Sequence, residues 1–211
     1  MRSIAPILLL LFAVSCANPS ETQRYSRTWT DEDRKFLLDN LNKSLSDVFE
    51  EIDSLTEEQW NYFPGEDNWS IAFVVEHLIT HDELFSREVR VLSQLPVMNA
   101  QPDSLFASDE EIMSYRDITP QNTGQAPVYL EPLGRWCSRE EAISAYRRTR
   151  SALIDYVEDS TADFRKFYTT SGRGPTKYRD LHQLLLISIA HTQRHTQQIR
   201  KVKLGPGFPS P

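Results

Sequence analysis

The sequence predicts an all-α protein with four long helices, of which the second and third can run parallel. Three observations lead to this prediction. Apolar residues recur every three or four positions through four long segments, which is the period of an amphipathic helix. No segment shows the alternation of apolar and polar residues that indicates a strand. The connection at residues 96–137 is long enough to let the second and third helices run parallel.

The four helices are expected at residues 31–55, 70–95, 138–158 and 176–203. Thr30 is the expected N-cap of the first helix, which has three acidic residues in its first turn. The second helix ends before a proline. Ser138, with Glu141 three residues later, predicts a capping box at the start of the third helix. Thr176 caps the fourth helix, after a break that contains glycine and proline. The bundle domain is therefore placed at residues 31–204.

The crossover at residues 96–137 holds five prolines and cannot form one continuous helix. Ser108, with Glu111 three residues later, predicts one short capped helix inside it. Long connections in compact domains are often walls or lids of binding sites. A packed crossover without a role in binding is an equal alternative. Residues 60–68 are expected to form a loop, and residues 205–211 a polar tail.

The first 30 residues are expected to lie outside the bundle. Residues 4–14 form an apolar run that is as long as the apolar part of a signal peptide and too short to span a membrane. The run ends at Ala13-Val14-Ser15-Cys16, which resembles the lipobox of bacterial lipoproteins. In that family the signal is cut before a cysteine that carries a diacylglycerol group. An ordinary secretory signal or a buried N-terminal segment is the alternative.

These features predict a signal peptide at residues 1–15, lipidation at Cys16 and a tether at residues 16–30. The protein is then exported and bound by its lipid to a membrane of the bacterial cell envelope. Cys137 would be left as the free thiol, and nothing near it in sequence supplies a base for nucleophilic chemistry.

The composition argues against several other classes of protein. The chain of 211 residues has a formal net charge of −7 and a pI of about 5.3, so it lacks the basic surface that binding of nucleic acid requires. Seven glycines leave little material for glycine-rich phosphate loops. Two cysteines exclude a disulfide-stapled scaffold and a cysteine-ligated zinc or iron–sulfur site. No nucleic-acid partner is expected.

Four of the five histidines form two pairs with a spacing of four residues. His77 and His81 lie on the second predicted helix, and His191 and His195 lie on the fourth. Residues four apart share one helix face, and this spacing lets two imidazoles reach one metal ion. Helical phasing turns both pairs at least partly toward the interior. One metal site shared by the two pairs is favoured over hydrogen-bonded core histidines.

Three stretches together resemble the DinB superfamily: Asn68-Trp69-Ser70-Ile71, Glu76-His77-Leu78, and the segment AHTQRHTQQI at residues 190–199. The resemblance extends from residue 31 to residue 203. It implies a four-helix bundle in an up-down-down-up arrangement, which agrees with the long crossover. It also implies that the bundle holds one divalent metal ion, zinc or nickel, through three histidines. By matching position these ligands are His77, His191 and His195.

His81 is an additional histidine on the same helix face. Phasing puts His81 nearer the centre of the apolar stripe, whereas the family motif implies His77. Because His77 and His191 both lie at the flank of their stripes, we expect His77 to be the ligand. We expect His81 to line the open coordination position, as a proton acceptor or substrate contact, since an imidazole suits acid–base catalysis near neutral pH. A hydrogen-bonded core position for His81 is the alternative.

The expected function is that of a metal-dependent hydrolase or transferase that acts on a small molecule. Three neutral ligands leave the ion its full charge, which acidifies a bound water or thiol. The thiol transferases of the family use bacillithiol or mycothiol in the cytosol, where an exported protein would not meet them. The alternatives are a non-catalytic metal-binding lipoprotein of the envelope and a metal-free interaction module. A homodimer stays open as the assembly.

Overall fold

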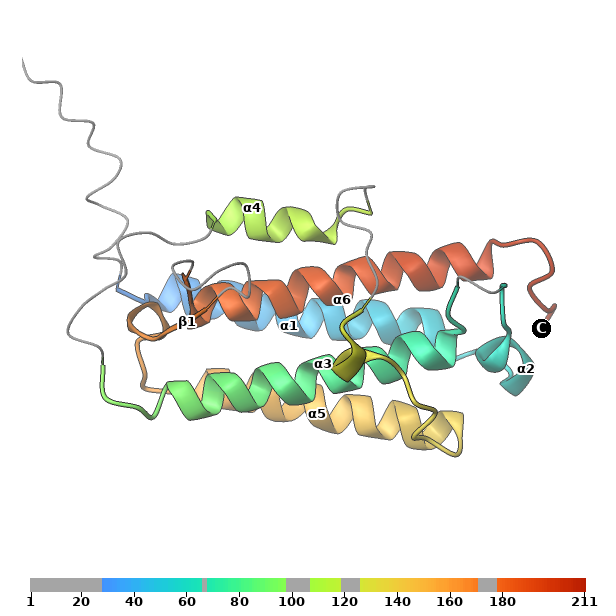
Figure 1. Cartoon of the computed structure of the whole chain (residues 1–211), viewed down its shortest axis with the longest axis horizontal. Coiled ribbons are helices and arrows are strands. Elements are labelled where there is room, and N and C mark those ends of the chain that lie inside the picture. The colour runs from blue at the N-terminus through green and yellow to red at the C-terminus, as the bar shows by residue number, and fades with distance from the viewer. Residues whose placement is uncertain (1–27, 66–67, 98–106, 119–125, 171–177) are drawn as a thin grey trace, which may run out of the picture.

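The computed structural model describes residues 28–65, 68–97, 107–118, 126–170 and 178–211. Within these residues, four long helices form the predicted bundle (Figure 1). They are α1 (Asp31–Ile52), α3 (Ile71–Leu92), α5 (Arg139–Asp159) and α6 (Leu181–Lys203). Helices α1 and α6 run in one direction and α3 and α5 in the other, so the up-down-down-up arrangement is confirmed.

Each long helix buries one apolar stripe in the centre of the bundle. Helix α1 packs against α5 and α6, and α3 packs against the same two helices. Leu37 of α1, Leu78 of α3, Leu153 of α5 and Leu185 of α6 are fully buried. Burial of one such side chain stabilises the fold by about 1.5–3 kcal/mol, so these stripes fix which face of each helix points inward.

The predicted N-caps of α1 and α5 are both present, but the predicted capping box of α5 is not. The Thr30 hydroxyl accepts a hydrogen bond from the Asp33 backbone N–H, and the Asp33 carboxylate accepts one from the Thr30 N–H. At α5, the Ser138 hydroxyl accepts from the Glu141 N–H, as predicted. The Glu141 carboxylate, however, accepts from the N–H of Cys137. The predicted capping box of α5 is therefore replaced by a single cap and a hydrogen bond one residue upstream.

The described parts of the crossover lie along the two helices that carry the paired histidines. Helix α4 (Asp109–Met113) and the 3-10 helix η2 (Ser114–Arg116) pack along α6. The 3-10 helix η3 (Val128–Leu130) packs on α3 (Figure 1). Ser108 forms the predicted capping box of α4. The crossover thus covers α3 and α6 from outside.

The first two long helices end earlier than predicted. Helix α1 ends at Ile52 rather than at residue 55, and α3 ends at Leu92 rather than at residue 95. A short helix, α2 (Glu57–Asn61), follows α1 and takes the first residues of the predicted loop at 60–68. Thr56 caps α2 with a full capping box, a local signal that we overlooked in the sequence.

The fourth long helix begins later than predicted. Residues Tyr168–Thr170 (β1) pair antiparallel with Tyr178–Asp180 (β2), so the chain is extended where we expected helix. Asp180 is the N-cap of α6, because its carboxylate accepts from the N–H of Gln183. The 3-10 helix η4 (Phe164–Lys166) precedes this small ribbon. Strands of three residues are too short to show an alternating pattern.

The predicted signal peptide, the predicted lipid site Cys16 and the predicted cap Thr176 lie outside the described residues. Along the part of the chain that the structure describes, no helix is both long and apolar enough to cross a membrane. Residues 205–211 pack against the bundle: the Tyr62 hydroxyl donates to the Pro206 carbonyl at 2.9 Å, and the Phe208 ring meets the Tyr62 ring edge-on.

Candidate metal centre

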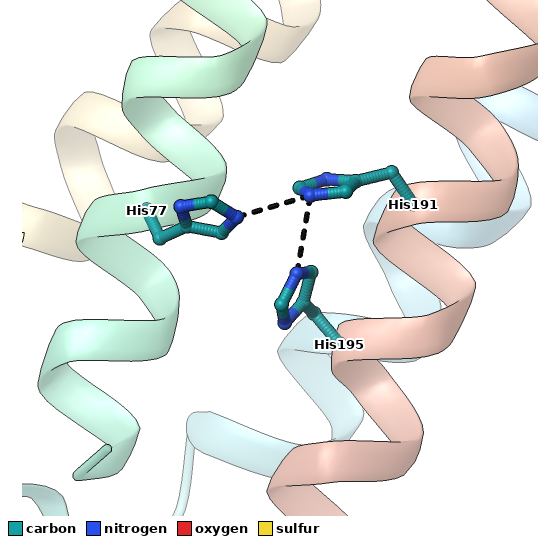
Figure 2. A group of neighbouring side chains, drawn as sticks. All are labelled: His77, His191 and His195. Atoms are coloured by element: carbon teal, nitrogen blue, oxygen red, sulfur yellow. Dashed lines mark hydrogen bonds between the residues drawn. The ribbon is translucent and has the colours of Figure 1, made fainter. Parts of the chain in front are cut away.

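Three histidine side chains meet between α3 and α6 (Figure 2). Nε2 of His191 lies 3.0 Å from Nε2 of His77 and 3.1 Å from Nε2 of His195. One ring nitrogen from each residue lies within 4.8 Å of the other two. Two nitrogen ligands at 2.0–2.1 Å from a tetrahedral zinc ion are themselves about 3.3–3.4 Å apart. The two separations at His191 are therefore close to those between the ligand atoms of one zinc ion.

Hydrogen bonds at Nδ1 hold two of the three imidazole rings in place. Nδ1 of His77 donates to the Leu130 carbonyl oxygen at 2.7 Å, and Nδ1 of His195 donates to Oε1 of Gln198 at 2.7 Å. A neutral imidazole with its proton on Nδ1 has its lone pair on Nε2. His77 and His195 therefore both direct a lone pair to the space that they share with His191. Hydrogen bonds of this kind are typical of histidines that ligate a metal.

His191 cannot donate a full hydrogen bond to both of its histidine neighbours. The single proton on its Nε2 faces two acceptors, the Nε2 atoms of His77 and His195. Nδ1 of His191 is buried and has no hydrogen-bond partner among the described residues. A divalent cation would take a lone pair from all three rings, so the donor set fits such an ion better than it fits a shared proton.

The electrostatics of the site keep the three rings neutral at pH 7. Burial lowers the pKa of His77 to about 4, although the hydrogen bond to Leu130 opposes the shift. Burial, together with the neighbouring His77, lowers the pKa of His195 to about 3. Burial also lowers the pKa of His191 well below its usual value. Histidine binds metal in its neutral form, so these shifts favour ligation.

Trp69 covers one side of the cluster from the turn that precedes α3. Its ring lies 4.9 Å from the His77 ring and nearly parallel to the His195 ring at 6.5 Å, centroid to centroid. His77 and His195 are buried, whereas His191 is half-buried. The cluster is thus shielded on the tryptophan side and retains some exposure at His191.

The family model of the DinB superfamily matches residues 40–199, which is most of the chain. The chain belongs to the DinB superfamily. Among solved structures, YfiT from Bacillus subtilis matches with a TM-score of 0.55 at 12% identity. The match covers 82% of this chain and 87% of YfiT, which is described as a probable metal-dependent hydrolase with an unusual four-helix bundle topology. At this identity the likeness establishes the fold alone. None of the curated proteins compared with the chain matches it.

In this DinB protein, His81 lies beside the three-histidine cluster and not in it. Its ring stacks between His191 and Phe85, with centroids 3.9 Å from each. Its Nδ1 has no hydrogen-bond partner among the described residues and lies 3.7 Å from Oδ1 of Asp82. The acid–base role of His81 stays a prediction. A core position explains its burial but leaves Nδ1 unsatisfied.

A buried ion pair lies behind His81 in the DinB bundle. Nε of Arg150 is 2.9 Å from Oδ2 of Asp82, and both side chains are fully buried. The Ser188 hydroxyl donates to Oδ1 of Asp82 at 3.0 Å, and Arg150 also donates to the Thr192 hydroxyl. This pair joins α3, α5 and α6 next to the metal centre. Sequence reasoning missed it, because partners on three helices have no common spacing.

Other residues around the centre carried weaker signals. Trp69 and Gln198 lie inside the stretches that resemble the DinB superfamily, but their contacts with the histidines were not foreseen. Leu130 acts through its backbone carbonyl, which no side-chain pattern can reveal. Cys137 is an exposed free thiol.

Proposed function

We propose that this DinB protein binds one divalent metal ion, zinc or nickel, through Nε2 of His77, His191 and His195. The observation that carries this proposal is the convergence of three neutral ring nitrogens, two of them oriented by hydrogen bonds from Nδ1. Imidazole ligands suit zinc and nickel, whereas magnesium and calcium prefer oxygen.

We further propose that the loaded protein is a hydrolase or transferase acting on a small molecule. When bound, an ion with three neutral ligands supplies Lewis-acid chemistry: it polarises a substrate carbonyl or phosphoryl group and makes water more acidic. YfiT, which has a similar fold, is described as a probable metal-dependent hydrolase, and this description supports the proposal. His77 and His195 hold their lone pairs in place, and Trp69 limits the access of water on one side.

His81 is proposed to act on the substrate or to accept a proton. Its contact with His191 and its unpartnered Nδ1 support this role. The Asp82 carboxylate, 3.7 Å from that nitrogen, would come within hydrogen-bond distance after a small movement of the ring.

A non-catalytic metal-binding protein of the cell envelope is the second candidate. The burial of His77 and His195 beneath Trp69 favours a closed site. An exchangeable water molecule on the metal, detected by relaxation of solvent protons with a paramagnetic substitute ion, would separate an open catalytic site from a closed one.

The lipobox-like segment supports a location at the envelope membrane, bound through Cys16. Metabolic labelling with a fatty-acid analogue should mark the wild-type protein and not the Cys16→Ser variant. Equal labelling of both proteins would contradict this location.

Metal analysis of the purified protein tests the metal centre directly. Wild type should contain about one equivalent of zinc or nickel, and His77→Ala or the double variant His191→Ala/His195→Ala should contain less than a tenth. His81→Ala is the matched control on the same helix and should retain the metal. Less than a tenth of an equivalent in metal-replete wild type would reject the site. Loss in both His77→Ala and His81→Ala would indicate a four-histidine site and favour storage.

A further inference from the structure

We propose that Glu76 is a positioning residue of the metal centre. Its carboxylate anchors residues 130–135 of the crossover, here called the strap, and the Leu130 carbonyl at the start of the strap orients His77. The inference rests on the proposed metal binding for its effect on affinity, but the orientation of His77 can be measured without any metal.

The Glu76 side chain lies under a turn of the strap. It is 3% exposed and accepts hydrogen bonds from three successive backbone N–H groups: Leu133 at 2.8 Å, Gly134 at 2.9 Å and Arg135 at 3.2 Å. Gly134 has a φ of +72°, a left-handed conformation that glycine adopts without steric cost. This turn lets the consecutive N–H groups face one carboxylate, as in other anion-binding backbone turns.

The Arg135 side chain fastens the same part of the strap along α3. Its Nε lies 3.4 Å from Oε1 of Glu76, and its guanidinium also reaches the Thr80 hydroxyl at 2.6 Å and the Glu83 carboxylate at 3.3 Å. These partners are spaced along one face of α3, next to His77. The strap is therefore held to the helix that supplies the first ligand.

Glu76 and His77 bind the strap at two points that are three residues apart. His77 donates to the carbonyl of Leu130, and Glu76 accepts from the N–H of Leu133. Leu130 is buried, but Leu133 is 81% exposed, so packing contributes little at the second point. Because two residues separate the points, a displacement at Leu133 moves the Leu130 carbonyl. Without that acceptor, the proton of His77 is free to move to Nε2, which removes the lone pair from the metal site.

Two measurements on Glu76→Gln test this role. Competition with a chromogenic chelator should give a zinc dissociation constant about tenfold higher than that of wild type, the effect typical of losing a partner of a metal ligand. In the metal-free protein, ¹⁵N spectra should show His77 in the Nδ1–H tautomer for wild type and a mixture for the variant. A residue that only stabilises the fold would not change the tautomer.

Two further variants control the experiment. Glu88→Gln removes a carboxylate of the same helix that accepts from the Thr169 hydroxyl rather than from the strap, and it should change the zinc affinity less than about twofold. Gly134→Ala adds a methyl group that meets no atom within 4 Å, so it acts through backbone strain alone. It should shift the affinity and the tautomer in the same direction as Glu76→Gln, by a smaller factor, and it decides the question if Glu76→Gln fails to fold.

The outcomes separate the two proposals. If wild type binds no zinc or nickel, the proposed function fails, and the tautomer of His77 still tests the positioning role. If wild type binds metal but Glu76→Gln and Gly134→Ala both retain wild-type affinity and tautomer, the positioning role is overturned and the metal centre stands.

Discussion

Two clusters of titratable side chains lie along α6, and they differ in how their charges and lone pairs are balanced. Near the start of α6, the Arg165 guanidinium is surrounded by the carboxylates of Asp33, Asp109 and Asp180. About 20 Å further along the helix, the Nε2 atoms of His77 and His195 both face Nε2 of His191. The first cluster includes the cation that its acceptors need, whereas the second has acceptors directed at a space that a cation would fill. A cluster of hydrogen-bond acceptors thus indicates a ligand site only when no positively charged side chain already neutralises the cluster.

The Arg165 cluster joins segments that are distant in sequence. Its guanidinium nitrogens lie 3.1 Å from Asp33 of α1, 2.7 Å from Asp109 of α4 and 3.1 Å from Asp180 at the start of α6. Burial alone would raise the pKa of Asp109, but the bond from Arg165 holds it below its usual value. Arg165 is thus a joint between the crossover and two helices of the bundle.

The largest expected effect comes from removing the cation of this joint. Arg165→Met removes the cation that neutralises three carboxylates, and we expect the free energy of unfolding to fall by about 3–5 kcal/mol in urea titrations at pH 7. The metal content should stay at the wild-type level, because the histidines are far away. Lys166→Met, which removes a half-exposed partner of Asp163, is the control and should cost less than about 1 kcal/mol. Equal effects of the two substitutions would refute a structural role for Arg165.

The second prediction is that the two clusters change the stability of the protein differently as the pH falls. The measurement uses protein from which a chelator has removed any metal. The folded-state pKa values of His77 and His195, about 4 and about 3, lie below the unfolded value near 6.5. The unfolded chain therefore binds more protons between pH 6.5 and 4, so stability is lost as the pH falls through this range. His77 alone should account for about 2 kcal/mol at pH 5. In the Arg165 cluster, Asp33 and Asp109, with lowered pKa values, lose their contribution only below about pH 4. Burial raises the pKa of Asp180 to about 6, so the contribution of Asp180 grows as the pH falls through that value.

Urea titrations at pH 7.5, 6 and 5 measure this difference. The double variant His77→Gln/His195→Gln should show a much shallower decline than wild type, because its side chains do not titrate. An equal change of stability in wild type and in the double variant from pH 7.5 to 5 would show that the cluster is not buried in neutral form.

The smallest expected effect concerns the edge of the Arg165 cluster. The indole N–H of Trp29 donates to Nδ1 of His182 at 3.1 Å in a buried contact. Trp29→Phe keeps an aromatic ring near Phe164 but removes this buried hydrogen bond, so the unfolding free energy should fall by about 1 kcal/mol. Trp136→Phe is the control, because the Trp136 indole nitrogen has no hydrogen-bond partner among the described residues. A larger loss in the control would contradict the assigned hydrogen bond.

The sequence predicted the parts of the fold that depend on local pattern. Apolar spacing located four long helices, and the length of the crossover indicated that α3 and α5 run parallel. The start of α6 was misplaced, because β2 forms only by pairing with β1 across residues 171–177. The Arg165 cluster was missed for the same reason: its members come from four segments that meet only in the folded chain.

The candidate site shows the same division. The spacing of His191 and His195 pointed to a shared face of one helix, and the motif resemblance selected His77 over His81. The structure brings those three histidines together. The acceptor that orients His77 is a backbone carbonyl, and every residue carries one, so no sequence pattern could have identified Leu130. Glu76 lies in a stretch that resembles the superfamily, but its hydrogen bonds to the strap depend on the fold of the crossover.

Trp29 fixes the direction in which the chain enters the bundle. It is buried against His182, at the end of α6 that lies about 20 Å from His195. Anything joined to the protein upstream of Trp29 is therefore attached at the pole of the bundle where α6 begins, about 20 Å along that helix from His195. If a lipid on Cys16 holds that pole at a bilayer, the metal centre is carried away from the headgroups and is reached by solutes from the aqueous side of the envelope.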